Sequence, residues 1–222
     1  MKVPTKTVWQ QSSEVFHRCA LEYDSWFDNS LLFAIELAAI KALTAQATPS
    51  SLEIGVGPGR FAEPLSTVFG VDPANAPLYL AAARNIQTCQ AVGESLPFKE
   101  NSFSRISLFF TLCFVQNPLE VLAEARRVLR NDGYLLLGIV PADSQWGQSL
   151  LKKKNSGHPF YEHARFFTVK KCKALLDRNG FSIYNSMSTL YQVPGSVTIM
   201  EQPQSGMDEN AGFVVLQMKK NE

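Results

Sequence analysis

The sequence lacks the features that would place it in several common classes of protein. Its four cysteines stand far apart, without the paired spacing of a zinc site. Lysine and arginine number 21 against 20 aspartates and glutamates, so the chain lacks the basic excess of nucleic-acid-binding domains. The most apolar long segment, residues 31–43, contains two charged residues and is too short to cross a bilayer. The N-terminus has no apolar core typical of a secretory signal.

These absences favour a cytoplasmic protein with reduced cysteines. We expect a small-molecule substrate and no nucleic-acid or membrane partner. We also expect no bound metal, because His158 and His163 lie five residues apart in a segment with a proline, which is poor ligand spacing. The sequence leaves the oligomeric state open.

The chain does contain enough apolar sequence for one large core, with 45% hydrophobic and 11% aromatic residues. Its 222 residues fit one domain, and no repeat or linker divides them. We therefore expect a single domain over residues 1–222 with an N-terminal helical cap at 1–47. Residues 141–167 exceed the usual length of a strand-to-helix connection, which predicts a lid or substrate-binding insertion.

Periodicity predicts most of the remaining elements. Helices are expected at 30–47, 75–85, 118–130 and 168–179. A further helix is expected directly after a glycine-rich turn that spans residues 55–59. Residues 131–133 should end the helix before them. Strands are expected at 104–110, 133–140, 181–187 and 212–218, the last two antiparallel at the sheet edge. Residues 193–211 are expected to form a long loop near the active edge.

The most informative segment is the glycine-rich turn itself. A short apolar run from Ser51 leads into Glu53-x-Gly55-x-Gly57-x-Gly59. Glycines at alternate positions let the backbone bend sharply, so a ligand can lie against bare peptide groups. A strand followed by such a turn and a helix start presents N–H groups at the edge where α/β sheets bind nucleotides.

The spacing of these glycines indicates which kind of nucleotide the turn binds. Counted from Gly55, the sixth position holds Arg60, where a dinucleotide-binding motif has glycine. Glu53 stands two positions before the first glycine, and its carboxylate suits a cationic ligand better than a pyrophosphate. A nicotinamide oxidoreductase is therefore a weaker alternative, and a glycine turn without ligand is another.

The pattern Glu-x-Gly-x-Gly-x-Gly resembles the first motif of class I S-adenosylmethionine-dependent methyltransferases. Gly93-Glu94-Ser95-Leu96-Pro97-Phe98 and Arg127-Val128-Leu129 resemble later motifs of this family, in its type 11, small-molecule branch. The resemblance implies a Rossmann-like, doubly wound α/β fold. Its sheet would have seven mostly parallel strands, an antiparallel last strand and helices on both faces. It also implies methyl transfer from S-adenosylmethionine to a small acceptor; a non-catalytic cofactor-binding sensor or partner protein is the alternative.

The same resemblance implies a set of cofactor contacts: Tyr23, Glu53, Gly55, Gly57, Gly59, Arg60, Asp72, Pro73, Gly93, Glu94 and Thr111. Asp72 stands where a ribose-binding carboxylate falls, and its two oxygens can accept both ribose hydroxyls. The alternative reading is that Asp72-Pro73 opens a helix. Gly93 and Glu94 belong to the adenine side, where Val92 replaces the family's usual hydrogen-bonding residue.

No general base is evident in the sequence. Methyl transfer requires mainly in-line alignment and exclusion of water. Weak candidates for a catalytic or substrate contact are Tyr23, in a segment resembling one that folds over the cofactor, and Tyr161 and His163 in the insertion. Cys113 is expected to pack and not to react.

Overall fold

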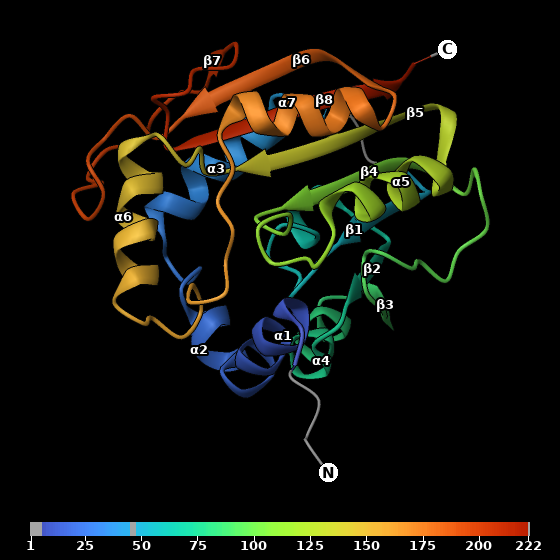
Figure 1. Ribbon diagram of the computed structural model, residues 1–222, viewed down its shortest axis with the longest axis horizontal. Helices are drawn as coiled ribbons and strands as arrows, with labels where there is room; N and C mark the ends of the chain where they lie inside the picture. Colours follow the sequence, from blue (N-terminus) through green and yellow to red (C-terminus); the bar gives the residue numbers. More distant parts are fainter. Residues whose placement is uncertain (1–5, 45–47, 222) are drawn as a thin grey trace.

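The computed structural model describes residues 6–44 and 48–221, and one sheet of eight strands forms its centre (Figure 1). The strands are β1 (Ser51–Ile54), β2 (Phe69–Asp72), β3 (Gln87–Gln90), β4 (Phe103–Phe109), β5 (Leu129–Ile139), β6 (Phe181–Thr189), β7 (Gln204–Ser205) and β8 (Phe213–Lys220). Their order is β3-β2-β1-β4-β5-β8-β6-β7. Strands β1 to β5 pair in parallel, whereas β8 pairs antiparallel with both β5 and β6.

The predicted Rossmann-like α/β fold is therefore confirmed, with one strand more than the predicted seven. The additional strand is the two-residue β7, which pairs antiparallel with β6 at the sheet edge. It lies inside residues 193–211, which the sequence predicted to be loop throughout. A two-residue strand is too short to produce a detectable alternation of side chains.

The helices are α1 (Val8–Arg18), α2 (Ala20–Ser25), α3 (Leu31–Lys41), α4 (Asn75–Ala83), α5 (Pro118–Val128), α6 (Gln145–Asn155) and α7 (Val169–Arg178), with a 3-10 turn η1 (Glu63–Leu65). In Figure 1, α5 and α7 cover the near face of the sheet and α3 lies behind it. Helices α1 and α2 pack beside α4, and α6 lies beyond the carboxyl ends of β4 and β5. No helix of the described segments is long and apolar enough to span a membrane.

The central strands are apolar on both sides because helices cover both faces. On β5, Leu135 and Leu137 pack into the core under α5 and α7, whereas Leu136 packs with α3. On β8, Val214 and Val215 divide between the two cores in the same way. This alternation sets the sheet between two apolar layers and leaves its carboxyl edge open for a site.

Several predicted elements are confirmed with small shifts of their ends. Helices α4, α5 and α7 fall within the predicted ranges, and the Thr168 hydroxyl caps α7 by accepting the N–H of Lys171. The last two strands are antiparallel, as predicted. Helix α3 ends at Lys41, before the predicted end; residues 1–5 and 45–47 of the predicted cap lie outside the described residues.

The helix predicted directly after the glycine turn is wrong. That part of the chain forms turns and only the three-residue η1. Pro64 lies in the first turn of η1, and Ser66 adopts a left-handed conformation (φ 50°) that ends it. A helix dipole therefore does not contribute to ligand binding here, and the loop can offer only its own N–H groups.

The predicted turn at residues 131–133 is also wrong. These residues lie inside β5, which begins at Leu129 directly after α5. The register between β4 and β5 shifts between the pairs Phe103–Leu129 and Arg105–Tyr134, so extra residues are accommodated as a bulge. Pairing with β4 thus overrides the local turn preference of Asn131, Asp132 and Gly133.

An ion-pair network around Asp24 holds the N-terminal helices against the sheet. The Asp24 carboxylate accepts two hydrogen bonds from Arg60, at 2.6 and 2.8 Å, and one from Arg84 at 3.0 Å. Arg84 also donates to the carbonyl of Pro58 at 2.8 Å, which ties α4 to the glycine turn. Burial opposes ionisation of Asp24, but the bonds from Arg60 and Arg84 outweigh it and lower the pKa of this carboxyl.

We expect Asp24→Asn to lower the free energy of unfolding by about 2 kcal/mol, because two largely buried guanidinium groups lose their shared buried counter-charge and keep only the exposed Asp28 and Glu63. The thermal midpoint should fall by roughly 4–8 °C. The folded-state pKa of Asp24 is lowered, so its stabilisation is present above the ordinary pKa of ~4 and is lost as pH falls through the folded value. The difference between the two proteins, measured by thermal unfolding, should therefore close below about pH 4.

The matched control is Asp132→Asn, which breaks an exposed pair with Arg130 and should leave the midpoint unchanged. Equal midpoints for wild type and Asp24→Asn at neutral pH would contradict a stabilising role for the network.

Candidate cofactor and acceptor site

Two adjoining cavities open at the carboxyl edge of the sheet. The glycine-loop cavity, of about 100 Å³, lies against the turn after β1 and the ends of β2 and β4. The aromatic cavity, of about 370 Å³, lies between α2, α3 and the segment around α6. The two cavities share a wall formed by Phe16, Tyr23, Phe27, Phe110 and Phe114.

All the predicted cofactor contacts except Gly59 line the glycine-loop cavity. Gly59 has a left-handed backbone (φ 85°), and a Cβ there would fall 2.5 Å from Cδ1 of Ile86. Its role in the structure is therefore close packing under the loop. Arg60 lines the cavity, but its guanidinium is held by Asp24 and by Asp28, the latter at 2.8 Å.

The glycine turn brings bare backbone to the cavity. A Cβ on Gly55 would fall 2.3 Å from the Thr111 hydroxyl oxygen, so the ends of β1 and β4 approach each other closely only with glycine there. A Cβ on Gly57 would meet only the Tyr23 ring edge, at 3.8 Å. The backbone at Gly57 is thus open on its cavity side and available to a ligand.

Asp72, at the end of β2, braces this turn. One carboxylate oxygen accepts the Gly57 N–H at 3.0 Å and the other accepts the Ala74 N–H at 2.8 Å. Helix α4 begins later, at Asn75, with Ala74 as its N-cap and no side-chain cap, so Asp72 does not act as its capping residue. Burial raises the pKa of Asp72 to about 6. Each oxygen keeps a lone pair for a ligand hydroxyl.

Glu53 is the second carboxyl in the glycine-loop cavity. Its side chain is buried, and its Oε2 has no hydrogen-bond partner within the described segments. Burial raises its pKa to about 8, while Arg105 opposes the shift and Asp72 adds to it. An orphaned buried carboxyl oxygen fits a cationic ligand group, which would supply the missing counter-charge. Glu53 and Asp72 therefore have the chemistry to hold a cationic group and a hydroxyl group, respectively.

Glu94 and Thr111 are partly occupied by the protein itself. The Glu94 carboxylate accepts the N–H groups of Gln116 at 2.8 Å and Asn117 at 3.1 Å, which ties the segment after β3 to the start of α5. The Thr111 hydroxyl donates to the Phe109 carbonyl at 3.0 Å. These bonds set the shape of the cavity, and Gly93 and Pro73 complete its lining.

The aromatic cavity is built mainly of rings that pack edge to face. Trp26 and Phe160 have ring centroids 4.8 Å apart, and Phe16 and Tyr23 lie 5.1 Å apart. The structure brings Tyr23 and Tyr161 to this cavity from distant parts of the chain, but His163 does not line either cavity. Tyr23 and Tyr161 are thus far apart in the sequence but line the same cavity, whereas His163 lies outside both cavities.

The hydroxyl and thiol groups of the aromatic cavity are protonated at neutral pH. Burial raises the pKa of Tyr161 to about 12, and burial together with nearby Tyr161 and Glu36 raises that of Tyr23 well above its ordinary value. Burial also raises the pKa of Cys113 to about 12, and its thiol donates to the Phe110 carbonyl at 3.2 Å. None of these three groups is a base at neutral pH, and Cys113 has the protonated state expected of a packing residue.

Sequence reasoning missed Glu36, the carboxyl of the aromatic cavity. It lies on α3, is 7% exposed, and lines this cavity. The signal in the sequence is a lone acid inside the apolar run 31–43. Within the described segments, no group of three side chains suitable for a metal occurs.

Comparisons with known proteins agree with this geometry. A family profile described as "Methyltransferase domain" matches residues 52–137, from β1 to β5. An uncharacterised protein of Mycobacterium tuberculosis is 36% identical over 209 residues, covering 92% of this chain and 73% of that protein. An uncharacterised protein of Methanocaldococcus jannaschii is 35% identical over 207 residues, covering 93% and 98% respectively.

A solved structure from Thermotoga maritima is similar over nearly the whole chain. It is described as a S-adenosylmethionine-dependent methyltransferase, possible histamine N-methyltransferase. The TM-score is 0.88 at 34% identity, and the match covers 95% of this chain and 100% of that one. With its glycine loop, its sheet order and these relatives, the chain belongs to the class I S-adenosylmethionine-dependent methyltransferases.

Proposed function

We propose that this methyltransferase acts on a small-molecule acceptor bound in the aromatic cavity. The observation that carries the proposal is the shared wall between a cavity matched to the cofactor and a larger, aromatic one. A volume of about 370 Å³ is typical of small-ligand pockets. A protein that only binds the cofactor, the alternative, has no use for a second cavity of this kind.

When bound, S-adenosylmethionine would supply a methyl group from its sulfonium to a lone pair of the acceptor, leaving S-adenosylhomocysteine. In this proposal, Glu53 holds the cofactor's cationic end and Asp72 its ribose. Tyr23 and Phe110 stand in the shared wall, beside the path between the cavities. Aromatic faces there favour positive charge, and their packing keeps water from the reacting atoms.

Phe110 supports this assignment through its backbone. It follows β4 with a φ of 57°, a left-handed conformation that is strained for a bulky residue. Its ring stacks on Phe213 with centroids 5.0 Å apart, which holds the strained residue in place. Strain of this kind is retained where a side chain must be aimed at a site.

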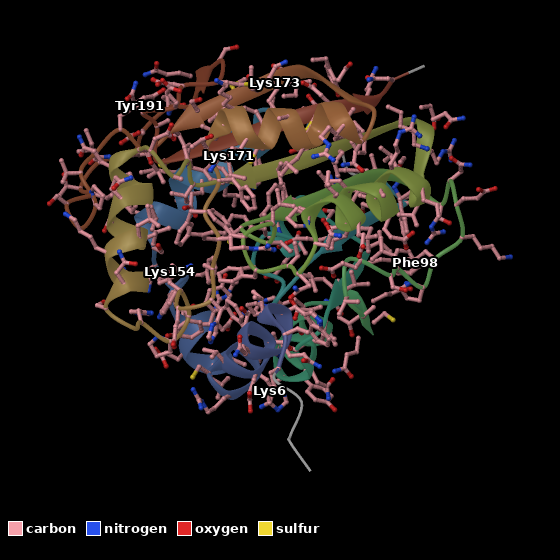
Figure 2. The ribbon with its side chains drawn as sticks, in the orientation of Figure 1. Lys6, Phe98, Lys154, Lys171, Lys173 and Tyr191 are labelled. Carbon is pink, nitrogen blue, oxygen red and sulfur yellow. The ribbon has the colours of Figure 1, made fainter. Side chains whose placement is uncertain are left out.

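We also propose that residues 141–167 form the lid of the aromatic cavity. Lys154 of α6 donates to the Ala164 carbonyl at 2.5 Å, and Trp146 donates to the Gln192 carbonyl at 2.8 Å (Figure 2 labels Lys154). The backbone N–H of Arg165 donates to the Cys113 carbonyl at 2.8 Å. The Lys154 bond holds the segment together, and the bonds to Gln192 and Cys113 join it to the chain just after β6 and β4, so it closes one side of the cavity.

The direct test is an acceptor panel of small amines, phenols, thiols and carboxylates, scored by formation of S-adenosylhomocysteine. Amines come first because the Thermotoga maritima relative is described as a possible histamine N-methyltransferase. We expect turnover with at least one class. Turnover of peptides but of no small molecule would overturn the proposal.

We expect Asp72→Ala to weaken S-adenosylhomocysteine binding by roughly 10- to 100-fold, because charge-assisted hydrogen bonds to the ribose are lost. Isothermal titration measures this affinity, and circular dichroism checks that the turn braced by Asp72 is still folded. Asp177→Asn, on the exposed side of α7, is the control and should bind like wild type. An unchanged affinity for folded Asp72→Ala would remove Asp72 from the cofactor site.

We expect Phe160→Ala to lower kcat/KM at least tenfold with the acceptor that the panel identifies, because the opened lid admits water. Phe160 lines only the aromatic cavity, so S-adenosylhomocysteine affinity should change less than about twofold. Phe98→Ala is the matched control: Phe98 packs on Phe69 and Phe103 on the side of the molecule opposite Lys154 (Figure 2). It should lower stability and leave kcat/KM unchanged; equal kinetic effects of both variants would refute the lid.

A further inference from the structure

The aromatic cavity contains a carboxyl group that the fold does not explain. Glu36 projects from α3, a helix whose other buried residues, Ile35, Ala39 and Ile40, are all apolar. Its side chain is 7% exposed, and no described residue donates a hydrogen bond to it or forms an ion pair with it. An apolar residue at this position would pack without any charge to compensate.

Such a group destabilises the empty protein. A buried carboxylate without a partner is unfavourable, and the group responds by keeping its proton. Burial accordingly raises the pKa of Glu36 to about 8. A ligand that brought a positive charge to Glu36 would remove this penalty, and a neutral ligand would not.

The other groups around the cavity leave the charge of Glu36 uncompensated. Tyr23, Tyr161 and Cys113 are held neutral by burial. The Lys153 ammonium lies 5.8 Å from the Tyr161 ring centroid and forms no ion pair with Glu36 in the described structure. His158 also lines the cavity, and its buried Nδ1 has no partner there either.

The two cavities thus contain separate carboxyls. Glu53 and Asp72 line the glycine-loop cavity, whereas Glu36 lines only the aromatic one. Glu36 is therefore free to serve a second ligand while the cofactor is bound. The rings around it add a further attraction for cations, since aromatic faces are electron-rich.

We propose that Glu36 is the acceptor-binding carboxylate and that the acceptor is a small amine. Its protonated nitrogen pairs with the Glu36 carboxylate, which then takes one proton from it and so frees the lone pair that accepts the methyl group. The apolar body of the amine packs against the rings of the aromatic cavity. This inference rests on the proposed function, because it assigns the same cavity to the acceptor. It predicts discrimination by charge: a cation binds, a neutral analogue of the same shape binds weakly, and an anion is rejected.

The test uses three probes of similar shape: phenethylamine, 2-phenylethanol and 3-phenylpropionate. Each is titrated calorimetrically into full-length protein saturated with S-adenosylhomocysteine. We expect phenethylamine to bind at least tenfold more tightly than the alcohol, and the carboxylate to give no measurable binding. Equal binding of amine and alcohol, or preference for the carboxylate, would overturn the assignment of Glu36.

The key variant is Glu36→Gln, which keeps the shape of the side chain and removes its charge. We expect at least a tenfold loss of phenethylamine affinity, with the affinities for 2-phenylethanol and S-adenosylhomocysteine within twofold of wild type. The empty variant should also unfold at a higher temperature at pH 9, because a buried charge is gone. Glu22→Gln, on the exposed side of α2, is the charge-matched control and should behave like wild type.

The pH profile separates Glu36 from its neighbours. Amine affinity should rise about tenfold per pH unit as pH approaches about 8, where Glu36 loses its proton, and level off above it. Glu36→Gln should flatten this profile, and His158→Asn should retain it. A profile that stays in Glu36→Gln and disappears in His158→Asn would overturn the proposal.

Failure of this inference is distinguishable from failure of the proposed function. If the protein binds S-adenosylhomocysteine and methylates only neutral small acceptors, Glu36 is not an amine site and the proposed function stands. If it binds the cofactor product and methylates no small molecule, the proposed function itself fails, and this inference fails with it.

Discussion

The site depends first on how closely the carboxyl ends of β1 and β4 approach each other. That approach is possible because Gly55 has no Cβ, which would otherwise fall 2.3 Å from the Thr111 hydroxyl. The carbonyl of Val71 on β2 then accepts the N–H groups of both Gly55 and Val56, at 2.8 and 3.0 Å. Asp72 accepts the Gly57 N–H, so three neighbouring strands determine the path of one loop. The loop lines one of the two cavities, and Phe110, directly after β4, stands in the wall between them.

That the glycine-loop residues would lie together was predictable, because they are within short sequence distances of strand ends. Glu53, Gly55 and Asp72 follow from a strand–turn pattern whose chemistry is local. The strands and most helices were predictable for the same reason, since alternation and 3.6-residue periodicity report which side is buried. The errors arose where tertiary contacts overrode local preference, as at Asn131 and Gly133, which pairing with β4 draws into a strand.

The aromatic cavity was not predictable from the same patterns. Its walls come from α2, α3, the end of β4 and the segment around α6, and no local motif links them. Tyr23 and Tyr161 could be suggested one by one, but only the fold brings them together and leaves His163 out. Glu36 is the clearest case: helical periodicity shows that one face of α3 is buried, and it does not show that this face meets a cavity at one position.

The buried carboxyls make the site a source of instability that ligands can relieve. Burial raises the folded-state pKa of Glu36, Glu53 and Asp72. The contribution of these groups to the stability of the folded protein is therefore fully present below their ordinary pKa of ~4 and is lost as pH rises through their folded-state pKa values. The contribution of Asp24 to stability has the opposite pH dependence, because Arg60 and Arg84 lower its pKa. At neutral pH and above, the Asp24 network therefore stabilises the N-terminal cap while the site carboxyls oppose folding. Ligands that bind only the folded protein and bring positive charge to these carboxyls stabilise it by mass action. Because α2 and α3 both form walls of the aromatic cavity, occupancy of the site and stability of the cap are coupled through the same residues.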